Sequence, residues 1–583
     1  MCGIAVILPN SAVEVPFDAI DRMTDALIHR GPDARSIQRL AGCHLGHTRL
    51  SILDPVGGGQ PMCDEGRRFW IVFNGEIFNH PELRITLESL GHYFRSRSDT
   101  EVLLHSYMEW GRSCVSRLNG QFAFAVWDEQ QQSLFVARDR MGEKPLYFAR
   151  TSQGHLLIAS EMKSIIAFGE LTPRIDLESV ESYLSFFYVP PDRTIYRDVQ
   201  CLPPAHAAII VANGREETWR YWRPALSGRS ISETEAVEGI QTLLKQAVRR
   251  QMVADVPVGC FLSGGLDSTT LAAQMSALSG HRIKTYSVGF GDLIDELPFA
   301  RDAAAAYGTD HHELQMEIDV SAALERMLDV YDEPFADSSN IPTWHVCEFA
   351  RRDVKVVLSG DGADELFGGY EWYRSLLEAD RADPSADQWL LHMRQSTHLY
   401  GDRTILWGDR GRPDIADLIR GRFGPPEGVT GIDRAASFDL SCYLGGDILV
   451  KVDRAAMAHG LETRSPFLDV DLVEFVLSLP REMRFKTGEG GRLKYLMRRA
   501  FEHLWPPSVR TRGKQGFGAP VYHWMQQPAV ARLWERVIAP DSALSVLLPG
   551  TAVVGPTLRP QRRWTMLCLG LWLERHGSCL AHL

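Results

Sequence analysis

Residues 256–268, VPVGCFLSGGLDS, decide the fold of the larger part of this chain. The segment starts with an apolar, β-compatible run, and after it Leu271, Ala272 and Met275 share one helical face. A strand, a tight loop and a helix are therefore expected in that order. Adjacent glycines let backbone N–H groups turn toward an anion, the serines add hydroxyl donors, and a helix N-terminus adds positive charge. The segment predicts a pyrophosphate-binding loop.

Asp267 lies among these phosphate donors, where its carboxylate would repel a phosphate unless a divalent cation lay between them. A magnesium ligand is the economical role for this residue. A bare SGG is more often an ordinary turn that caps a helix, but the full SGGLDS after a strand is more specific. It resembles the loop of ATP pyrophosphatases, which cleave ATP between the α and β phosphates. The sequence has no G-x-x-x-x-G-K-[ST] motif, which argues against γ-phosphate transfer by a P-loop.

Length and composition set broad limits. With 583 residues the chain is too long for a single core, so several domains are expected. The net charge of −12 argues against a nucleic-acid scaffold, and no apolar run approaches the roughly 18 residues of a membrane span. The cysteines include no C-x-x-C pair, which argues against a zinc site and a disulfide framework. We expect a soluble, cytoplasmic protein with no nucleic-acid or membrane partner.

The chain begins Met1-Cys2-Gly3-Ile4. If the initiator methionine is removed, Cys2 carries both a thiol and a free α-amine. Such an amine has a pKa near ~8 and a thiol a pKa near ~8.5, so the amine can accept the thiol proton at neutral pH. A buried small residue is the alternative, and the motifs that follow favour a nucleophile.

Three motifs after Cys2 supply what the capture of glutamine requires. Arg49, in HTRLSIL, can pair with an α-carboxylate, and Asp99, in SDTE, can pair with an α-ammonium. Asn74 and the Gly75 N–H, in FNGEI, can stabilise the oxyanion that forms when a thiolate attacks an amide. Each motif alone would also fit a turn or a capped helix start.

Together and in this order, these motifs closely resemble the class II glutamine amidotransferase domain, in which an N-terminal cysteine hydrolyses glutamine to ammonia. The resemblance implies an α+β, Ntn-hydrolase-like fold with stacked antiparallel sheets between helices. It implies that Cys2, Asn74 and Gly75 are catalytic. It implies a glutamine site made of Arg49, Leu50, Ser51, Ile52, Leu53, Asn74, Gly75, Glu76 and Asp99.

Turn-forming residues mark a boundary after this region. Pro203-Pro204, Asn213-Gly214 and Pro224 precede a new helix, which starts at Ser232 with a capping box completed by Glu235. We predict a glutaminase domain at residues 1–210, a linker at 211–231 and a synthetase domain at 232–583.

The second domain continues with alternating strand and helix patterns. Residues 283–290 and 354–358 are strand-like, and a helix is expected around 299–307. Such β-α-β units predict an α/β domain with an open parallel sheet, where ligands bind at the carboxyl ends of the strands. Val288 would lie near an adenine, although a plain buried strand end fits it equally well.

An acidic, glycine-rich segment follows the strand at 354–358 and reads SGDGADELFGGY, residues 359–370. Asp361, Asp364 and Glu365 would repel one another there unless they share a cation or a proton. An acidic metal-binding corner is therefore favoured over a solvated loop.

The order SGGLDS, DEPFADSS and SGDGADELFGGY resembles the glutamine-hydrolysing asparagine synthetases, with weak stretches near 372–432 and 535–558. The resemblance implies a synthetase domain of the ATP pyrophosphatase type, with ATP as co-substrate and Mg²⁺ held by Asp267 and Asp364. It implies that Lys514, in RTRGKQGF, approaches the triphosphate as a catalytic residue. The ATP site would comprise Leu262, Ser263, Gly264, Gly265, Asp267, Ser268, Val288, Ser359 and Gly360.

Asp361 lies where well-known asparagine synthetases carry a glutamate that assists the acceptor chemistry, so the match assigns it a catalytic role. An aspartate is one methylene shorter, which bears on the identity of the acceptor. Asp453, Arg454, Glu462 and Arg464 are interpreted as a structural charge network, and the apolar face of the helix around 564–572 as core.

These observations lead to the hypothesis of a two-site enzyme, with a homodimer as its candidate assembly. It would hydrolyse glutamine and use ATP to activate a carboxylate, most simply the aspartate side chain, for amidation. One alternative is an amidotransferase with a cell-envelope or secondary-metabolite acceptor. Others are a tRNA-modifying ATP pyrophosphatase, which the acidic charge and the glutaminase half disfavour, and a catalytically silent interaction protein, which the intact nucleophile and metal positions disfavour.

Overall fold

The computed structural model describes most of the chain. The described residues are 1–10, 12–211, 215–226, 228–289, 296–383, 392–393, 404–424, 429, 431–487, 491–513 and 518–580. Phe290, at the end of a predicted strand, and Lys514, the predicted triphosphate ligand, lie outside these ranges.

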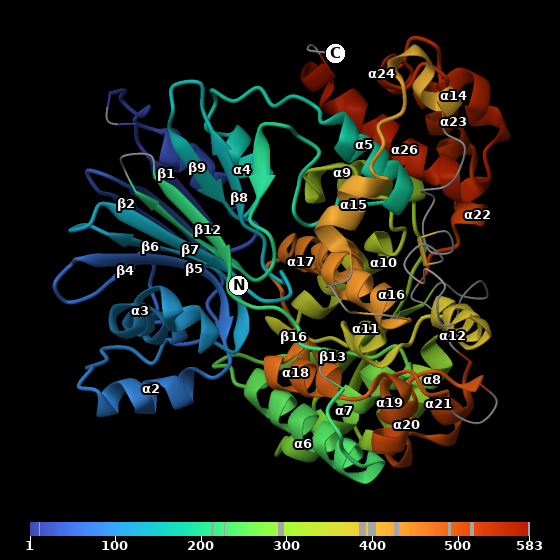
Figure 1. The fold of residues 1–583 in the computed structure, drawn as a ribbon, viewed down its shortest axis with the longest axis horizontal. Helices are drawn as coiled ribbons and strands as arrows, with labels where there is room; N and C mark the ends of the chain where they lie inside the picture. The colour runs from blue at the N-terminus through green and yellow to red at the C-terminus, as the bar shows by residue number, and fades with distance from the viewer. Residues whose placement is uncertain are drawn as a thin grey trace.

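Within the described ranges, two six-stranded antiparallel sheets form the N-terminal part of the molecule (Figure 1). The first sheet has the order β10 (Val199–Cys201), β8 (Tyr147–Arg150), β9 (Leu156–Ala159), β1 (Cys2–Leu8), β3 (His44–Arg49) and β2 (Ala34–Arg39). The second sheet has the order β12 (Glu216–Arg220), β11 (His206–Val211), β7 (Ser133–Arg138), β6 (Gly120–Asp128), β5 (Phe69–Ile77) and β4 (Met62–Cys63).

Alternation along the strands explains why these sheets stack. Val72 of β5 and Ala123 and Ala125 of β6 pack with Ile4 and Val6 of β1 in the core between the sheets. Because successive side chains of a strand point to opposite faces, the intervening residues face helix α3 (Asp99–Trp110) and α2 (His80–Ser89) beyond it. Helices α1 (Ala19–Asp25) and α4 (Met162–Ile166) cover the first sheet. The predicted α+β domain of stacked sheets between helices is confirmed.

A five-stranded parallel sheet organises the described C-terminal part. Its order is β15 (Asp310–Gln315), β14 (Lys284–Gly289), β13 (Val258–Phe261), β16 (Val356–Leu358) and β17 (Glu462–Arg464). Helices α6 (Glu233–Gln251), α7 (Leu266–Leu278) and α8 (Leu297–Tyr307) pack together beside β13 and β14. Helices α10 (Asn340–Arg351) and α17 (Leu449–Met457) pack together against β14 and β17, respectively. This confirms the predicted α/β domain with a parallel sheet.

Further helices surround this core. They are α5 (Leu177–Phe186), α9 (Val320–Val330), α11 (Ala363–Phe367), α12 (Trp372–Ala382), α14 (Thr404–Trp407), α15 (Ala416–Phe423), α16 (Asp433–Phe438), α18 (Val470–Ser478), α19 (Arg481–Arg484), α20 (Tyr495–Phe501), α21 (Pro507–Thr511), α22 (Val521–Trp524), α23 (Pro528–Val537), α24 (Ala543–Leu547), α25 (Thr551–Val554) and α26 (Pro560–Arg575). A π-helical segment, Asp439–Ile448, leads directly into α17. Trp564, Leu567, Cys568 and Leu571 of α26 are buried, as predicted.

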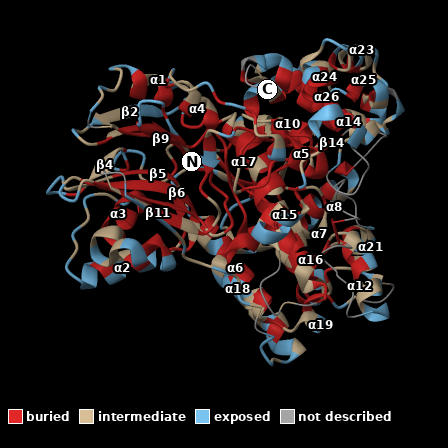
Figure 2. Cartoon of the chain, turned by 45° about the horizontal axis from the view of Figure 1, so that its top comes forward, coloured by how far each residue is buried: buried red, intermediate tan, exposed pale blue. Residues whose placement is uncertain are grey.

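The two parts of the molecule meet around the first residues of the chain. The N-terminus lies between the antiparallel sheets and the helical part in Figure 1. Buried residues continue from the stacked sheets into the region of α10 and α17 in Figure 2. Strand β12 lies inside the predicted linker at 211–231 and pairs with β11, so it extends the second sheet. No helix among the described residues has the length and apolar character needed to span a membrane.

The start of α6 carries the predicted capping box. Ser232 Oγ accepts a hydrogen bond from the Glu235 N–H at 3.2 Å, and Glu235 accepts one from the Ser232 N–H at 3.0 Å. We predict that Ser232→Ala destabilises this helix end by about 1 kcal/mol, because it removes an N-cap acceptor. Hydrogen exchange should accelerate about fivefold in the first turn of α6, as that free energy implies. Ser230→Ala, an exposed position upstream, is the control; equal exchange in both variants would contradict the prediction.

Candidate functional site

A small cavity lies beside the first residues of the chain. Its volume is about 30 Å³, and its lining includes Cys2, Arg49, Gly75, Glu76 and Asp99. The rest of the lining consists of Met1, Leu50, Ile52, Leu53, Gly58, Gln60, Phe73, Ser98 and Thr100. Most residues predicted to bind glutamine therefore surround one cavity. Ser51 and Asn74 are not among the lining residues, and the Ser51 N–H donates to Asp33 instead.

Asn74 holds the backbone of the predicted nucleophile. The Cys2 N–H donates to Asn74 Oδ1 at 2.9 Å. Asn74 Nδ2 is buried and has no hydrogen-bond acceptor among the described residues. Gly75 follows with a φ of 152°, and a Cβ there would lie 2.1 Å from the carbonyl oxygen of Gln121, so no side chain fits. A buried amide donor without a partner suits an oxyanion that forms only during reaction.

Arg49 is fixed by the loop that follows it. Its Nη1 donates to the Pro55 carbonyl at 2.8 Å, and its Nη2 donates to the carbonyls of Leu53 and Asp54 at 3.1 and 2.8 Å. Three backbone acceptors thus orient a guanidinium at the cavity wall, as a site for a carboxylate requires.

The cavity also contains buried acidic groups. Burial raises the pKa of the Asp99 carboxyl, and it raises the pKa of Glu76 well above the usual value, with the nearby Asp99 adding to this effect. Burial likewise raises the pKa of the Cys2 thiol, against the opposing effect of the N-terminal ammonium. An entering ammonium group would favour the ionised carboxylates, because opposite charges stabilise each other at low polarity. The charged groups in the cavity wall therefore complement those of an α-amino acid.

A second cavity, of about 640 Å³, lies at the carboxyl ends of the parallel strands. All the described residues that were predicted to bind ATP or magnesium line it. They are Leu262, Ser263, Gly264, Gly265, Asp267, Ser268, Val288, Ser359, Gly360 and Asp364, and Asp361 lies among them. The open end of a parallel sheet is where such a fold binds its ligands.

The SGGLDS segment forms the predicted tight loop between β13 and α7. The Ser263 N–H donates to Ser268 Oγ at 3.2 Å, and the Gly265 N–H donates to Ser263 Oγ at 3.3 Å. Gly264 has a φ of 66°, and a Cβ there would lie 2.5 Å from Phe299 Cβ, so the turn requires glycine. The N-terminus of α7 therefore lies at the cavity, where the positive end of the helix dipole favours an anion.

The three carboxylates of residues 361–365 have different partners, and the structure does not group them as one three-carboxylate site. Asp361 accepts a hydrogen bond from Ser359 Oγ at 2.7 Å. Glu365 accepts one from the Tyr370 hydroxyl, and burial raises its pKa to about 8. Asp361 precedes α11, and Asp364 and Glu365 are successive residues of that helix, whose side chains point in different directions.

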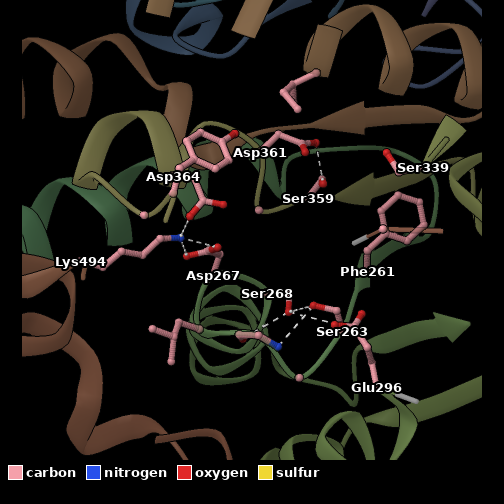
Figure 3. A pocket seen from close by; sticks show the side chains of 18 of the residues that line it. Phe261, Ser263, Asp267, Ser268, Glu296, Ser339, Ser359, Asp361, Asp364 and Lys494 are labelled. Atoms are coloured by element: carbon pink, nitrogen blue, oxygen red, sulfur yellow. Dashed lines mark hydrogen bonds and ion pairs between the residues drawn. The ribbon is translucent and has the colours of Figure 1, made fainter. Parts of the chain in front are cut away.

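Asp364 instead lies beside Asp267, which comes from α7. Both carboxylates contact the ammonium of Lys494, as Figure 3 shows. The described residues contain no group of three His, Cys, Asp or Glu side chains that could hold a metal alone. Magnesium usually binds one or two protein carboxylates and completes its shell with phosphates and water. Asp267 and Asp364 contact the same cation, the ammonium of Lys494, so their carboxylates are close enough to fit such a site.

Two protein-family models match the chain. One, described as asparagine synthase, matches residues 239–574, and another, described as a glutamine amidotransferase domain, matches residues 1–222. The chain belongs to the asparagine synthase family. It is therefore a glutamine-dependent carbon–nitrogen ligase that uses ATP for amidation.

Relatives of this asparagine synthase family member match over nearly the full chain. Asparagine synthetase (glutamine-hydrolyzing) 1 of Bacillus subtilis is 32% identical, over 98% of this chain and 96% of that protein. Asparagine synthetase (glutamine-hydrolyzing) 3 of the same organism is 34% identical, over 94% of this chain and 92% of that protein. Amidase chry2 of Gibberella zeae is 30% identical, over 92% of both chains.

Buried ion pairs join the two halves of this asparagine synthase family member. Arg30 donates to the Cys2 carbonyl at 3.1 Å, to Glu161 at 2.8 Å and to both oxygens of Asp453 at 2.9 and 3.1 Å. Arg454, the next residue, pairs with Glu161 at 2.8 Å. The predicted charge network around Asp453 is present, and it crosses the junction between the halves.

A second set of buried charges lies at β17. Glu462 accepts from the N-terminal ammonium at 2.8 Å and pairs with Arg464 at 2.6 Å. Arg464 also reaches Glu76 of the small cavity at 3.1 Å, and its carbonyl accepts the Ser359 N–H of the large cavity at 2.8 Å. One strand of the asparagine synthase half therefore contacts both sites.

Sequence reasoning missed Lys494 and the partners of Arg30. Lys494 lies in GRLKYL, and a lysine before a helix is usually solvated, so the local pattern carried no signal for a buried contact. Arg30 lies in the segment HRGPD, and its sequence neighbours carry no signal for a contact with Asp453. The contacts of both residues arise from segments hundreds of positions away.

Proposed function

We propose that this protein makes asparagine, using glutamine as the nitrogen donor and ATP, cleaved to AMP and pyrophosphate, to activate the aspartate side chain. The observation that carries the proposal is the presence of two cavities in one chain. The wall of one has the charges that an α-amino acid would need, beside a thiol, and the other has a glycine-rich loop beside paired aspartates. We place the enzyme in the cytoplasm.

In the small cavity, we assign Cys2 as the nucleophile after removal of Met1. Met1 is buried and lines the cavity, whose volume of about 30 Å³ holds only roughly one or two water molecules. Removal of Met1 would both make room for glutamine and free the α-amine of Cys2. That amine would accept the thiol proton, and the thiolate would attack the amide carbon of glutamine.

Around the reacting amide, Asn74 Nδ2 and the Gly75 N–H would stabilise the oxyanion, ammonia would leave, and water would release glutamate from the thioester. Arg49 would bind the α-carboxylate and Asp99 the α-ammonium. The orphaned amide donor of Asn74 and the raised pKa values of Asp99 and Glu76 support these roles.

In the large cavity, the side-chain carboxylate of aspartate would attack the α-phosphorus of ATP. The SGGLDS loop would hold the departing pyrophosphate, and ammonia would displace AMP from the acyl-adenylate. Asp267 and Asp364 would hold magnesium, whose positive charge would stabilise the leaving pyrophosphate. We assign Asp361 to the acceptor side, where its buried carboxyl has a raised pKa and could accept a proton from the attacking ammonia. The assignment of Lys514 to the triphosphate stays a proposal from the family match.

A different acceptor carboxylate is the second candidate. Asp361 is shorter than the glutamate of well-known asparagine synthetases, and an amidase-named relative is 30% identical. The protein from Gibberella zeae does not identify that acceptor for this chain.

The acceptor can be identified by measuring pyrophosphate release from ATP over a panel of carboxylic acids, with the amide product identified by mass. We expect aspartate to give the highest kcat/KM and asparagine as the product. Glutamate, with one more methylene, is the matched control, and we expect it to react at least about tenfold less efficiently. Turnover with another acid and none with aspartate would establish the second candidate.

A further inference from the structure

Lys494 lies where the two aspartates of the large cavity meet. Its Nζ is 2.6 and 2.7 Å from the two carboxylate oxygens of Asp267 and 2.7 Å from Asp364. The side chain of Lys494 is 4% exposed, whereas those of the two aspartates are about 20% exposed. Figure 3 shows the ammonium between both carboxylates, at the N-terminal end of α7. The lysine is thus enclosed by protein, and the carboxylates face the cavity.

The backbone around Lys494 is shaped to hold it there. Lys494 has a φ of 58°, in the left-handed region that residues other than glycine rarely adopt. Such a conformation persists only where the surrounding structure enforces it. Gly369 contributes to this: a Cβ at that position would lie 1.8 Å from Asp364 Oδ1 and 2.1 Å from Lys494 Cε. Space for this ion pair is therefore built into two separate segments.

Other cationic side chains line the same cavity. Arg492, Arg498 and Arg512 line it together with Lys494. Arg512 donates to the Ser263 carbonyl at 3.1 Å, which places its guanidinium directly beside the SGGLDS loop. A polyphosphate bound by that loop would therefore have Lys494 among its neighbouring cations.

We propose that Lys494 is a built-in counter-ion, which holds Asp267 and Asp364 together before nucleotide binds. When a divalent cation binds between the two aspartates, the ammonium of Lys494 moves away from them and contacts the phosphates. The proposal rests on the proposed nucleotide and magnesium site. Without the lysine, the two carboxylates that flank its ammonium would repel each other. A divalent cation and an ammonium would repel each other at the same two carboxylates, so one must leave as the other binds.

In this role, Lys494 has opposite effects on the binding of two ligands. Lys494 competes with the metal in the nucleotide-free protein, and it assists pyrophosphate in the loaded protein. A lysine with only a structural role would make neither contribution. Removal of the positive charge should therefore strengthen the binding of the metal alone and weaken the binding of pyrophosphate.

The test is a titration of the full-length protein with Mn²⁺ in the absence of nucleotide. Electron paramagnetic resonance measures the bound Mn²⁺. We expect Lys494→Met to bind Mn²⁺ about tenfold more tightly than the unsubstituted protein, because a competing cation is gone. At saturating Mn²⁺, we expect the same variant to bind inorganic pyrophosphate about tenfold more weakly, measured by calorimetry. Lys494→Arg, which keeps the charge, should move both affinities back toward those of the unsubstituted protein.

The matched control is Lys486→Met. Lys486 is in the same region of the chain, is 48% exposed and pairs with Glu233 away from the cavity. Its loss should change neither affinity. Lys494→Gln, which removes the charge but keeps a hydrogen-bond donor, replaces Lys494→Met if the latter does not fold.

Unchanged or weaker Mn²⁺ binding in a folded Lys494 variant would overturn the proposal, as would unchanged pyrophosphate binding. These titrations involve neither glutamine, nor an acceptor, nor turnover. Failure to detect asparagine formation would therefore count against the proposed function. The binding results for the Lys494 variants could still be interpreted.

Discussion

Cys2→Ala is expected to abolish glutamine-dependent amidation and to leave ammonia-dependent amidation intact. Loss of the nucleophile should lower glutamine hydrolysis by about 10³-fold or more, because no other group replaces a covalent nucleophile. The large cavity does not include Cys2, so free ammonia should still support amidation within about twofold of the original rate. Glutamate release and amide formation should be measured in parallel, with glutamine and then with ammonium as the nitrogen source.

Cys43→Ala is the matched control for deletion of a buried thiol. Cys43 is fully buried in the core between the antiparallel sheets and does not line the small cavity. Its loss should leave glutamine hydrolysis within about twofold. Intact mass of the purified protein should also show removal of Met1. Glutamine hydrolysis by Cys2→Ala at a rate similar to that of Cys43→Ala would refute the assignment of the nucleophile.

Arg30→Met should strongly destabilise the junction between the two halves. Arg30 is completely buried, and its side chain bonds to the Cys2 carbonyl, Glu161 and Asp453. Removal of one partner from a buried ion pair leaves charge without compensation, which costs about 3 kcal/mol or more. We expect a lower midpoint of thermal unfolding. We also expect a higher ratio of glutamine hydrolysed to amide formed, because Arg30 no longer links the Cys2 carbonyl to Asp453 of the synthetase half.

Arg35→Met provides the comparison for this variant. Arg35 lies on β2 and pairs with Asp21 and Asp25 at the surface, with about a third of its side chain exposed. Exposed pairs of this kind contribute about 1 kcal/mol or less. The double variant Arg30→Met with Asp453→Asn should recover part of the lost stability, because it removes one orphaned carboxylate. Equal unfolding midpoints for Arg30→Met and Arg35→Met would contradict the role inferred for Arg30.

Local sequence signals were sufficient for the strand, loop and helix at residues 256–278. Apolar residues defined β13, adjacent glycines defined the turn, and a helical stripe defined α7. The capping box at Ser232 was equally local. In each case, the side chains that determine the geometry are neighbours in the sequence, so their pattern carries the information.

The missed features depend on distant segments. Lys494 and Asp267 are 227 positions apart, and Arg464 and Glu76 are 388 positions apart. No periodicity relates such residues, because their contact is set by the way whole elements pack. The separation of the acidic residues at 361–365 has a local cause. Asp361 precedes α11, whereas Asp364 and Glu365 are successive residues of that helix, and the three carboxylates have different partners.

Strand β17 implies an order of events during the synthesis of this protein. It completes the parallel sheet only when residues 462–464 are available, whereas the antiparallel sheets are complete at Arg220. The glutaminase half can therefore fold on the ribosome while the other half is unfinished. Once Glu462 emerges and docks, it covers the N-terminal ammonium in a fully buried pair. If Met1 is removed, as we propose, this order requires an aminopeptidase to act on the nascent chain, before that docking closes access.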